Sequence, residues 1–425
     1  MAKRISVWFL AGVIVATATV TFMITLLFGG SLVAAEEPSA SAASSTVSET
    51  VEEPKELTPK EITDKVASKV YELMAYYNNY YIGEIDVDAL VEGVAKGLVV
   101  YSGDKYGSYY TEEELNAVIS SYDGEFAGVG ISVTYNSVYG GIEIINVFEN
   151  GPAFEAGLLP NDLIIKVGGE DVAYLGYSNA IDAIRGEVGT SVTITVARGE
   201  NYAERFDVTL VRRVVEEVSV TYEEIKSEHV IQPIGYIRIT TFNDHTPEQF
   251  KAAIGKSFTN DAHGVIIDLR NNGGGTLNSV VSMLDMLLPS GPIVRVQYKN
   301  GQETVYESDM YKTSSRMPII ILVNGNTASA AELFTAALRD YGRAIILGET
   351  TYGKGTVQSI IELSDGSGLK LSTAMYAPPY SDNFEGVGIT PDIVVKMPDK
   401  YRNVNIFTLE PEEDAQLQAA IELYK

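Results

Sequence analysis

Residues 318–358 contain two short apolar runs separated by a helical pattern, and this arrangement restricts the fold strongly. The runs are Ile319 to Val323 and Ala344 to Leu347, and the helix between them opens near Ser329. Short β-branched runs that alternate with a helix are typical of parallel strands buried on both faces of a sheet. The segment therefore predicts a βαβ unit inside an α/β core.

The same segment places two reactive side chains at one edge of the predicted sheet. Ser329 follows the first strand, and Lys354 follows the second strand in a glycine-rich loop. Reactive groups of parallel sheets collect at the carboxyl ends of the strands. The fold would therefore bring a hydroxyl and an amine together, as a nucleophile and base pair requires.

Each of these residues also has an ordinary structural interpretation. A serine that opens a helix is commonly its N-cap, and a lysine in a loop is commonly solvated. Three features favour chemistry. Lys354 lies between two glycines, so its amine can approach a buried site and lose its proton when desolvated. Gln358 could hold that amine without adding charge. The glycine loop 273–275 and the amide of Ala330 are two backbone sources for an oxyanion hole.

Residues 123–214 change to strand periodicity, with short β-rich runs separated by Gly, Pro and Asn. Glycines in a GxG turn allow successive backbone N–H groups to converge on a terminal carboxylate, and an open strand edge can pair with a peptide main chain. A GxG turn alone is more often a plain hairpin. Here, however, two runs together resemble a PDZ domain. The first run resembles the carboxylate-binding loop of a PDZ domain and consists of Gly128, Val129, Gly130 and Ile131. The second run, at residues 151–162, resembles the GPA…AGL…GD run of that domain.

From residue 215 the sequence predicts a larger α/β region that extends to residue 398 and is followed by a C-terminal helix within 399–425. Its motifs resemble those of the C-terminal processing, or tail-specific, serine peptidases. The motifs are DLRNNGGG at 268–275, TASAAE at 327–332, GKGTVQ at 353–358 and GITPDI at 388–393. The resemblance covers about residues 60–425 and implies a ClpP/crotonase-like α/β serine protease core next to the PDZ domain.

The resemblance also implies roles for individual residues. It implies that Ser329 is the nucleophile, Lys354 the base and Gln358 the partner of that base. It also implies that Gly274 and Ala330 donate hydrogen bonds to the oxyanion. The choice between Gly274 and Gly275 as a donor stays open. The chemistry that the resemblance implies needs no metal or cofactor.

The motifs depart from the family pattern at three positions. Gly273 stands where the family commonly has proline, which loosens the loop but leaves the glycine pair that follows. Thr327 and Ala331 replace serines on either side of Ser329. None of these changes removes a catalytic group, and Ala331 makes the assignment of the nucleophile less ambiguous.

The first 30 residues predict a transmembrane anchor. Lys3 and Arg4 precede an uncharged stretch from Ile5 to Gly30, which is long enough to span a bilayer with its positive end in the cytoplasm. Alternatively, residues 33–35 would serve as the small-residue cleavage site of a signal peptide, and the protein would be secreted. In both cases the rest of the chain is predicted to be extracytoplasmic.

Two segments separate this anchor from the PDZ block. Residues 31–57 are rich in Ser, Ala, Thr, Glu and Pro and predict a disordered, solvated linker. Residues 58–122 predict a small helical segment, in which Thr58 and Thr111 each open a helix with a Glu three residues later. A tyrosine cluster in this segment could be a binding surface, but packing in a core or across a dimer is the favoured prediction. It consists of Tyr76, Tyr77, Tyr80 and Tyr81.

Composition and partial motifs argue against several function classes. A formal net charge of −26 disfavours binding to a phosphate backbone, so no nucleic-acid partner is predicted. The chain has no cysteine and therefore no thiol nucleophile. Residues 348–354 match the first part of a P-loop, but position 355 is Gly where Mg²⁺ binding would need Ser or Thr. The histidines lie in surface contexts, which disfavours a histidine base. They are His229, His245 and His263.

The chain is therefore predicted to be a membrane-anchored serine endopeptidase that binds protein C-termini through its PDZ domain and cleaves upstream through an acyl-enzyme. Its predicted partners are protein or peptide substrates, the membrane and, in a homodimer, a second copy. Arg185, at the end of the PDZ helix, is either a coupling residue that gates the core or a solvated helix-end charge. The alternatives are a non-catalytic PDZ adaptor and a peptidase that makes single regulatory cuts.

Overall fold

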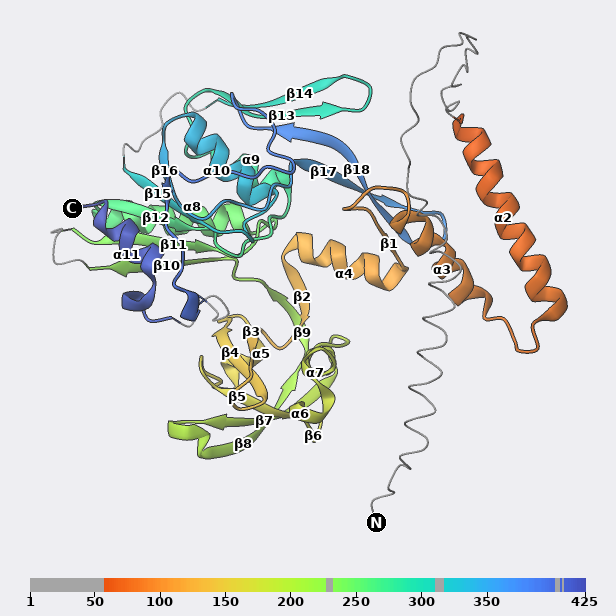
Figure 1. Cartoon of the computed structure of the whole chain (residues 1–425). Coiled ribbons are helices and arrows are strands. Elements are labelled where there is room, and N and C mark those ends of the chain that lie inside the picture. Colours follow the sequence, from red (N-terminus) through yellow and green to blue (C-terminus); the bar gives the residue numbers. More distant parts are fainter. Residues whose placement is uncertain (1–56, 227–231, 310–316, 402–405, 407–408) are drawn as a thin grey trace, which may run out of the picture. The chain divides into compact units, whose positions relative to one another are not determined.

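The computed structural model describes residues 57–226, 232–309, 317–401, 406 and 409–425 (Figure 1). These residues fall into two compact units, one ending at Glu84 and one beginning at Ile85. The predicted anchor over residues 1–30 and the predicted linker up to residue 56 lie outside the described residues. Within the described ranges, no helix is both long and apolar enough to cross a bilayer.

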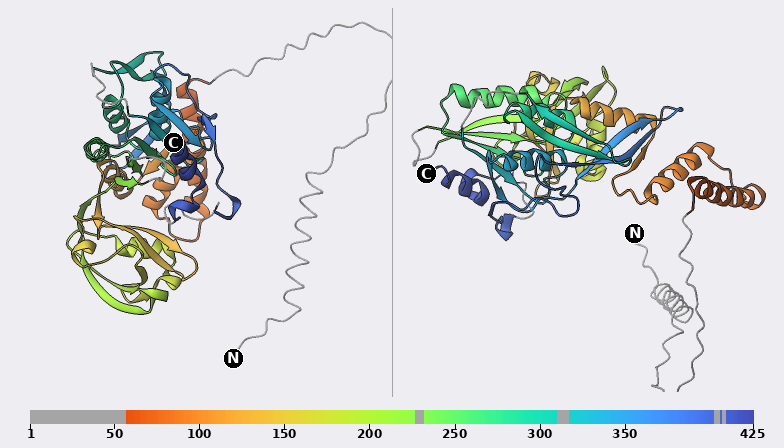
Figure 2. Two further views of the ribbon diagram at one scale, coloured as in Figure 1. Left: turned by 90° about the vertical axis from the view of Figure 1, so that its left-hand side faces the viewer. Right: turned by 90° about the horizontal axis from the view of Figure 1, so that it is seen from above.

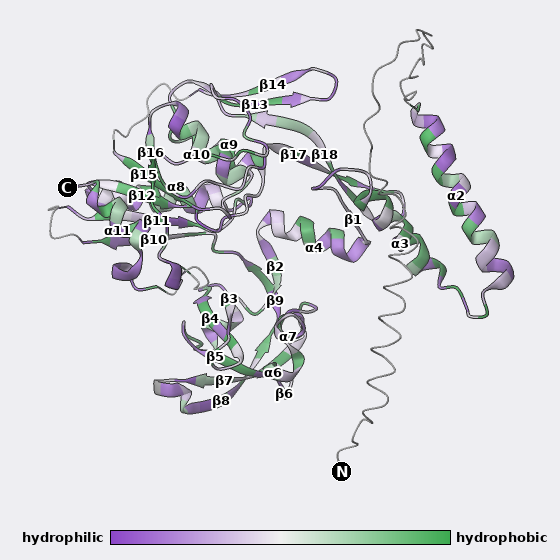
Figure 3. Cartoon of the chain, in the orientation of Figure 1, coloured by the Kyte–Doolittle hydropathy of each residue, from purple (hydrophilic) through white to green (hydrophobic). Residues whose placement is uncertain are grey.

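The first unit contributes the helix α2 (Pro59–Tyr80). It begins with the predicted capping box, in which the Glu61 N–H donates to Thr58 Oγ1 at 3.3 Å and the Thr58 N–H donates to Glu61 Oε2 at 2.7 Å. Hydrophobic and hydrophilic residues alternate along the helix, and none of its residues is buried (Figure 3). Among the described residues of this unit, no element covers the tyrosines, so their packing in a core or across a dimer stays a prediction. The exposed tyrosines are Tyr76, Tyr77, Tyr80 and Tyr81.

The second unit opens with α3 (Val87–Val100), the short strand β1 (Ser108–Tyr110) and α4 (Glu112–Asp123). The second predicted capping box is confirmed, since the Glu114 N–H donates to Thr111 Oγ1 at 3.2 Å. Strand β1 was not expected from the sequence. It pairs antiparallel with the distant strand β18 (Gly368–Ala377). This segment therefore belongs to the same sheet as β18, which is separate from the six-stranded core sheet.

The PDZ block is built on a sheet whose main path is β3-β4-β5-β7-β8, with β6 paired to β5. Its strands are β3 (Ile131–Asn136), β4 (Gly141–Val147), β5 (Leu163–Val167), β6 (Glu170–Asp171), β7 (Ser191–Arg198) and β8 (Glu204–Val211). Its helices are α5 (Pro152–Glu155), α6 (Val172–Leu175) and α7 (Tyr177–Ile184). The chain enters and leaves the block through a separate antiparallel pair, β2 (Glu125–Gly128) and β9 (Arg213–Glu216).

The core sheet has the order β10-β11-β12-β15-β16-β19. Its strands are β10 (Val220–Ile225), β11 (Ile234–Ile239), β12 (Gly264–Asp268), β15 (Ile319–Val323), β16 (Ala344–Gly348) and β19 (Ile393–Val394). All strands after β10 pair in parallel, and every residue of β12 and β15 is buried. The predicted βαβ unit is confirmed, because β15 and β16 are parallel neighbours with α10 (Ala330–Asp340) between them in sequence.

Alternate residues of these strands pack against helices on opposite faces of the sheet. One face carries Ile267 and Ile321 in a cluster with residues of α8 (Thr246–Thr259), α9 (Leu277–Asp285) and α10. The other face carries Ile266 and Ile320 in a cluster with α11 (Ala415–Glu422), which lies across the sheet from α8 (Figure 2). The C-terminal helix predicted within residues 399–425 is therefore present as α11, and it forms one layer of the core.

A second sheet contains the path β1-β18-β13-β14, with β17 (Thr356–Glu362) paired to β18. Strands β13 (Gly291–Tyr298) and β14 (Glu303–Ser308) form an antiparallel hairpin. Short 3₁₀ turns complete the described elements: Glu200–Tyr202, Asp399–Tyr401 and Pro411–Glu413. Strands β17 and β18 matter for function because they carry side chains into the region next to Ser329.

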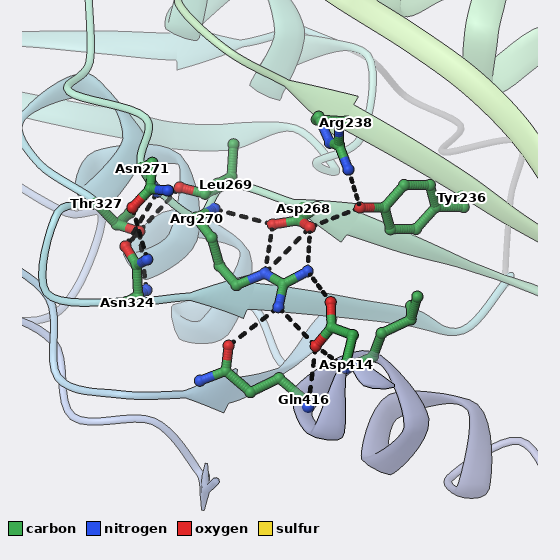
Figure 4. Close-up of polar contacts among 11 residues, drawn as sticks. Tyr236, Arg238, Asp268, Leu269, Arg270, Asn271, Asn324, Thr327, Asp414 and Gln416 are labelled. Carbon is green, nitrogen blue, oxygen red and sulfur yellow. Dashed lines mark hydrogen bonds and ion pairs between the residues drawn. The ribbon is translucent and has the colours of Figure 1, made fainter. Parts of the chain in front are cut away.

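A buried ionic network ties α11 to the end of β12 (Figure 4). Arg270 is 2% exposed, and its guanidinium donates to Asp268 Oδ2 at 2.6 Å, to Asp414 Oδ2 at 2.7 Å and to Gln416 Oε1 at 3.1 Å. The Tyr236 hydroxyl donates to Asp268 Oδ2 at 2.6 Å. Burial alone would raise the pKa of Asp268, but the charge and hydrogen bonds of Arg270 hold it below its ordinary value. The sequence contains no local signal for this network.

Candidate active site

Ser329 adopts a backbone conformation that L-residues seldom take. It occupies the N-cap position of α10 with φ 57° and ψ −121°. The threonine N-caps of this chain are extended instead, with φ −67° at Thr58 and −63° at Thr111. Positive φ at a non-glycine residue stores strain and is found mainly where the surrounding structure fixes a functional group. The geometry of Ser329 is therefore not that of the ordinary capping serine considered above.

The side chain of Ser329 faces a cavity of about 290 Å³ between α10 and strands β17 and β18. Apolar groups and a few polar groups line it, as is common for sites that accept a side chain. The lining residues are Tyr122, Gly275, Thr276, Leu277, Ser329, Ala330, Leu333, Thr356, Val357, Gln358, Ile360 and Tyr376. The cavity thus brings together the predicted residues Ser329, Ala330 and Gln358 with one member of the glycine loop.

Tyr376 links the two predicted catalytic segments and was missed by sequence reasoning. Its hydroxyl lies 3.2 Å from Ser329 Oγ and 2.9 Å from the Lys354 carbonyl oxygen. Burial raises the pKa of Tyr376, so the phenol keeps its proton. No pattern in the sequence distinguishes this tyrosine from an ordinary core aromatic of β18.

The Lys354 main chain lies at the site, but its amine points elsewhere. Lys354 Nζ is 4.8 Å from the centroid of the Tyr106 ring, and in the described part of the chain it has no hydrogen bond to Ser329 or Gln358. Burial lowers the pKa of the amine, the positive charge of Lys370 lowers it further, and nearby carboxylates oppose both effects. The Lys354 amine therefore loses its proton more readily than a solvated lysine does, and it rests on an aromatic ring.

The loop after α3 forms the wall against which this amine rests. The Tyr106 hydroxyl donates to Glu385 Oε1 at 3.1 Å, and Lys105 Nζ lies 2.6 Å from the same oxygen. The other oxygen of Glu385 accepts the Gly355 N–H at 2.7 Å. This loop belongs to the segment that was predicted only to be helical, so its contribution to the site was not anticipated.

Gln358 of β17 lines the cavity, and among the described residues its side chain has no hydrogen bond to Lys354. Its Nε2 donates to Thr356 Oγ1 at 2.8 Å and to Ser372 Oγ at 3.4 Å. The Ser372 hydroxyl in turn donates to Asp104 Oδ1 at 2.8 Å. The predicted role of Gln358 as the partner of the base therefore stays a prediction.

The amides of the glycine loop differ in whether they already donate a hydrogen bond. The Gly274 N–H is already used, because it donates to Asn272 Oδ1 at 2.8 Å. The N–H groups of Gly275 and Ala330 line the cavity and, among the described residues, donate to no other group. A Cβ on Gly274 would lie 2.8 Å from Ser329 Cβ, so glycine is required for this close approach. Of the two donors left open by the sequence, the geometry favours Gly275.

The predicted carboxylate-binding loop connects two strands of the PDZ region. Gly128 is the last residue of β2 and Ile131 is the first of β3, with Val129 and Gly130 between them. Gly130 has φ 79°, and a Cβ on it would lie 2.7 Å from Gly151 Cα. This position therefore requires glycine, and it packs against the GPA run that the sequence singled out.

Hydrogen bonds through the carbonyl groups fix the orientation of this loop. Val129 O accepts the Ala153 N–H at 2.8 Å, and Gly130 O accepts the Phe148 N–H at 2.9 Å. Within the described residues, the N–H groups of Val129 and Gly130 themselves donate no hydrogen bond. Two adjacent N–H groups without a partner at the start of a strand are donors of the kind that bind anions.

A groove for an extended peptide would run between β3 and α7. The Tyr177 hydroxyl of α7 lies 3.5 Å from the Val133 carbonyl oxygen of β3, and the Tyr177 and Tyr135 rings meet edge to face at 5.9 Å. A peptide that adds to the edge of β3 would compete with Tyr177 for this carbonyl.

The predicted coupling residue Arg185 is exposed at the C-terminal end of α7, and its side chain forms no hydrogen bond or ion pair with the described residues. Its neighbour Arg212 binds the end of that helix instead, donating to the carbonyls of Ala183 at 2.6 Å and Ile184 at 3.0 Å. The gating role of Arg185 therefore stays a prediction.

The histidines do not take part in the site as far as the structure describes them. His245 Nδ1 lies 3.7 Å from Glu216, and the His263 ring packs on Tyr424 at 6.1 Å. His229 lies outside the described residues. Neither described histidine is among the hydrogen-bond partners of Ser329.

Comparison with known proteins adds family information to this geometry. A family model described as peptidase family S41 matches residues 233–395, and a PDZ domain model matches residues 143–198. The carboxy-terminal-processing protease of Bartonella bacilliformis is 32% identical over 357 residues, which cover 82% of this chain and 80% of that protein. The carboxy-terminal processing protease CtpB of Bacillus subtilis is 31% identical over 386 residues, covering 89% of this chain and 77% of that protein.

A solved structure shares the fold. A protein from Bacteroides fragilis described as an S41 protease matches 81% of this chain and 92% of its own, with a TM-score of 0.57 and 17% sequence identity. At that identity the likeness concerns the arrangement of helices and strands alone. It agrees with the layered α/β core and the inserted block described above.

Proposed function

Because the chain belongs to peptidase family S41 and is a carboxy-terminal processing serine protease with a PDZ domain, we propose that it cleaves its substrates with a Ser329/Lys354 dyad. The observation that carries this proposal is the strained conformation of Ser329, at a helix N-terminus and facing a cavity with two unpaired amides. Such a serine presents its hydroxyl to a bound carbonyl group while nearby N–H groups face the oxygen that becomes charged.

In the proposed reaction, the neutral amine of Lys354 takes the proton of Ser329 Oγ as that oxygen attacks the substrate carbonyl carbon. The carbonyl electrons move onto oxygen, and the N–H groups of Gly275 and Ala330 stabilise the resulting negative charge. The carbon–nitrogen bond then breaks, and the ammonium group of Lys354 returns the proton to the leaving amine. Water hydrolyses the acyl-enzyme in the same manner, which regenerates the hydroxyl of Ser329.

For this reaction the Lys354 amine has to leave the Tyr106 ring. The move requires only new side-chain torsions, because Tyr376 already holds the Lys354 main chain next to Ser329. We regard the described arrangement as the resting one. In our proposal, a substrate tail bound to the PDZ block favours the assembled dyad, with Arg185 as the candidate coupling residue and Gln358 as the partner of the relocated amine.

Substrate recognition is assigned to the loop of Gly128 to Ile131. Its two unpaired amides would bind the C-terminal carboxylate, and the edge of β3 would pair with the peptide main chain. We further propose that the enzyme acts outside the cytoplasm, held by the N-terminal apolar stretch or secreted after its cleavage. The exposed tyrosines of α2 are the proposed contact of a homodimer.

The experiment that tests this function compares the full chain with its Ser329→Ala variant on an unstructured protein that ends in small apolar residues. The tail is supplied with a free carboxylate and with an amidated end. Cleavage by the unmodified enzyme alone, weakened by amidation, supports both the nucleophile and tail recognition. Binding of the free tail without cleavage by either protein would favour the adaptor alternative. Sequencing of the products distinguishes a single cut from degradation.

Tyr376→Phe is expected to lower kcat by about 10²-fold with little change in KM. The variant leaves the Lys354 carbonyl without its buried donor, and a misplacement of about 1 Å at a catalytic group costs about that factor. Steady-state kinetics measures both constants. Tyr341→Phe is the matched control, since its hydroxyl donates to the Pro292 carbonyl at 2.9 Å, away from Ser329. An equal loss of kcat in both variants would contradict a specific role for Tyr376.

Lys370→Gln is expected to move the acid limb of kcat/KM to higher pH. Activity needs the neutral Lys354 amine, so the rate rises as pH passes through its pKa. The charge of Lys370 lowers that pKa, and its removal therefore raises it. A pH–rate profile measures the shift. Lys299→Gln, at an exposed position of the same charge, serves as the control and should leave the profile unchanged. A shift of the Lys370→Gln profile toward lower pH would contradict the assignment.

A further inference from the structure

Glu332 is a buried carboxylate in the first turn of α10, and its side chain joins two separate segments of the active site. Its Oε2 accepts the Ser329 N–H at 2.9 Å and the Lys354 N–H at 2.8 Å. Its Oε1 accepts the Gly353 N–H at 2.7 Å and the Thr351 hydroxyl at 2.5 Å. The residue is 0% exposed. One carboxylate therefore contacts the backbone of the nucleophile and the backbone of the loop that carries the lysine.

These contacts go beyond ordinary helix capping. In a capping box, the Glu at the third helical position reaches back to the N-cap N–H, as Glu61 and Glu114 do in this chain. Both of those side chains are exposed and serve one helix each. Glu332 makes the same backward contact with Ser329, but it makes three more with residues 351–354. The additional contacts tie the helix to a loop that β16 separates from it in the sequence.

The chemistry of the four donors explains why the arrangement has a single geometry. Burial of a carboxylate is costly unless its oxygens are fully hydrogen-bonded, and charge-assisted bonds of this kind are short and strong. The donors here are three backbone amides and one hydroxyl, so both oxygens of the buried carboxylate are hydrogen-bonded. Any shift of the lysine loop relative to Ser329 would break at least one of these bonds.

We propose that Glu332 is a positioning residue that holds Ser329 and the loop of Lys354 in register for proton transfer. The proposal rests on the proposed function, in which those two residues are nucleophile and base. Glu332 does not touch the substrate. It acts through the backbone of both partners, and it supports the positive φ of Ser329 by binding the amide on one side of that residue.

The charge of Glu332 also affects the pH dependence of kcat/KM, which a purely structural role would leave unchanged. A negative charge near Lys354 favours the protonated amine, and Glu332 is one of the carboxylates that oppose the effect of burial on the pKa of Lys354. Removal of this charge therefore lowers the pKa of Lys354. Since the neutral amine is the active form, the acid limb of kcat/KM should move to lower pH.

The test uses the full chain with Glu332→Gln and Glu332→Asp. Glutamine keeps the shape but removes the charge and turns an NH₂ group toward N–H donors, so kcat should fall by about 10²-fold and the acid limb should move to lower pH. Aspartate keeps the charge but is one carbon shorter and does not span both segments. Its kcat should therefore fall while the acid limb stays at the wild-type pH.

Glu349→Gln is the matched control, because Glu349 accepts the Met397 N–H at 3.2 Å and makes no contact with Ser329 or Lys354. It should keep wild-type kcat and the wild-type pH profile. Urea denaturation of the full chain, followed by circular dichroism, reports whether the core of each variant is folded. If glutamine prevents folding, the aspartate variant decides the question, and wild-type kcat in that variant overturns the proposal.

The positioning role of Glu332 and the Ser329/Lys354 dyad can fail separately, and the two failures give different results. If Glu332→Gln has wild-type kcat and an unshifted acid limb while Ser329→Ala and Lys354→Met are inactive, the dyad stands and the positioning role of Glu332 is refuted. If Lys354→Met remains active, the proposed dyad itself fails. A fall of kcat in Glu332→Gln without any shift of the acid limb would reduce Glu332 to a structural residue.

Discussion

Lys354→Met is expected to lower kcat by about 10⁴-fold or more, because loss of one member of a nucleophile and base pair removes nearly all of its contribution. Methionine keeps an unbranched side chain that can rest on the Tyr106 ring where the Lys354 amine lies, so the surrounding packing should persist. Single-turnover cleavage of an unstructured tail substrate measures the loss. Binding of the same tail should be unchanged, since the PDZ loop is not altered.

Two controls sharpen this result. Lys370→Met removes a neighbouring positive charge but not the proposed base, and it should retain substantial activity with an altered pH profile. Lys354→Ala leaves space at the site, and added methylamine should restore part of the rate if a neutral amine is what the reaction lacks. Wild-type activity in Lys354→Met would show that another group takes the proton of Ser329. Tyr376 is not suited to that task, because burial raises its pKa.

Arg270→Met is expected to lower the free energy of unfolding by about 3–5 kcal/mol. The variant leaves the carboxylates of Asp268 and Asp414 buried without the guanidinium that binds both of them. Urea denaturation followed by circular dichroism measures the change. Arg213→Met is the comparison, because the ion pair of Arg213 with Glu155 is exposed and should contribute less than about 1 kcal/mol.

The pH dependence of this effect has a definite sign. In the wild type the pKa of Asp268 lies below its unfolded value, so its ionic contribution is present above that value and is lost as pH falls through the lower folded pKa. In Arg270→Met, burial without the cation raises the pKa of Asp268, so the variant gains stability as pH falls. The difference between the two proteins should therefore shrink toward acid pH. A difference that is constant with pH would contradict the role assigned to Arg270.

Local patterns in the sequence were sufficient for much of the fold. The capping boxes of Thr58 and Thr111 depend on residues three positions apart, and both are present as predicted. The strands Ile319–Val323 and Ala344–Gly348 were recognisable because burial on both faces requires continuous apolar runs. Their parallel pairing around α10 then places Ser329 at the carboxyl edge of the sheet.

Features that depend on contacts between distant segments could not be predicted. Tyr376 and Glu332 look like an ordinary strand aromatic and an ordinary helix Glu until β17, β18 and α10 come together. The use of the Gly274 amide by Asn272 depends on the fold of a tight loop, so the sequence left two oxyanion donors open. The resting position of the Lys354 amine depends on Tyr106, which lies in another segment.

The apolar residues of α2 show another limit of prediction from the sequence. Periodicity identifies which residues of a helix are apolar, but it does not say whether the partner surface belongs to the same chain. The tyrosines of this segment were expected to be in a core or a dimer, and in the single chain they are exposed. Their partner has to be found by experiment.

The buried network around Arg270 has a consequence for how this family of sequences can change over time. Loss of any one of Asp268, Arg270 or Asp414 leaves a charge in the interior without its partner, so each single substitution is expected to be strongly destabilising. Joint replacement by apolar residues of similar volume can be nearly neutral. These three positions should therefore be inherited as a set, kept together in some lineages and replaced together in others.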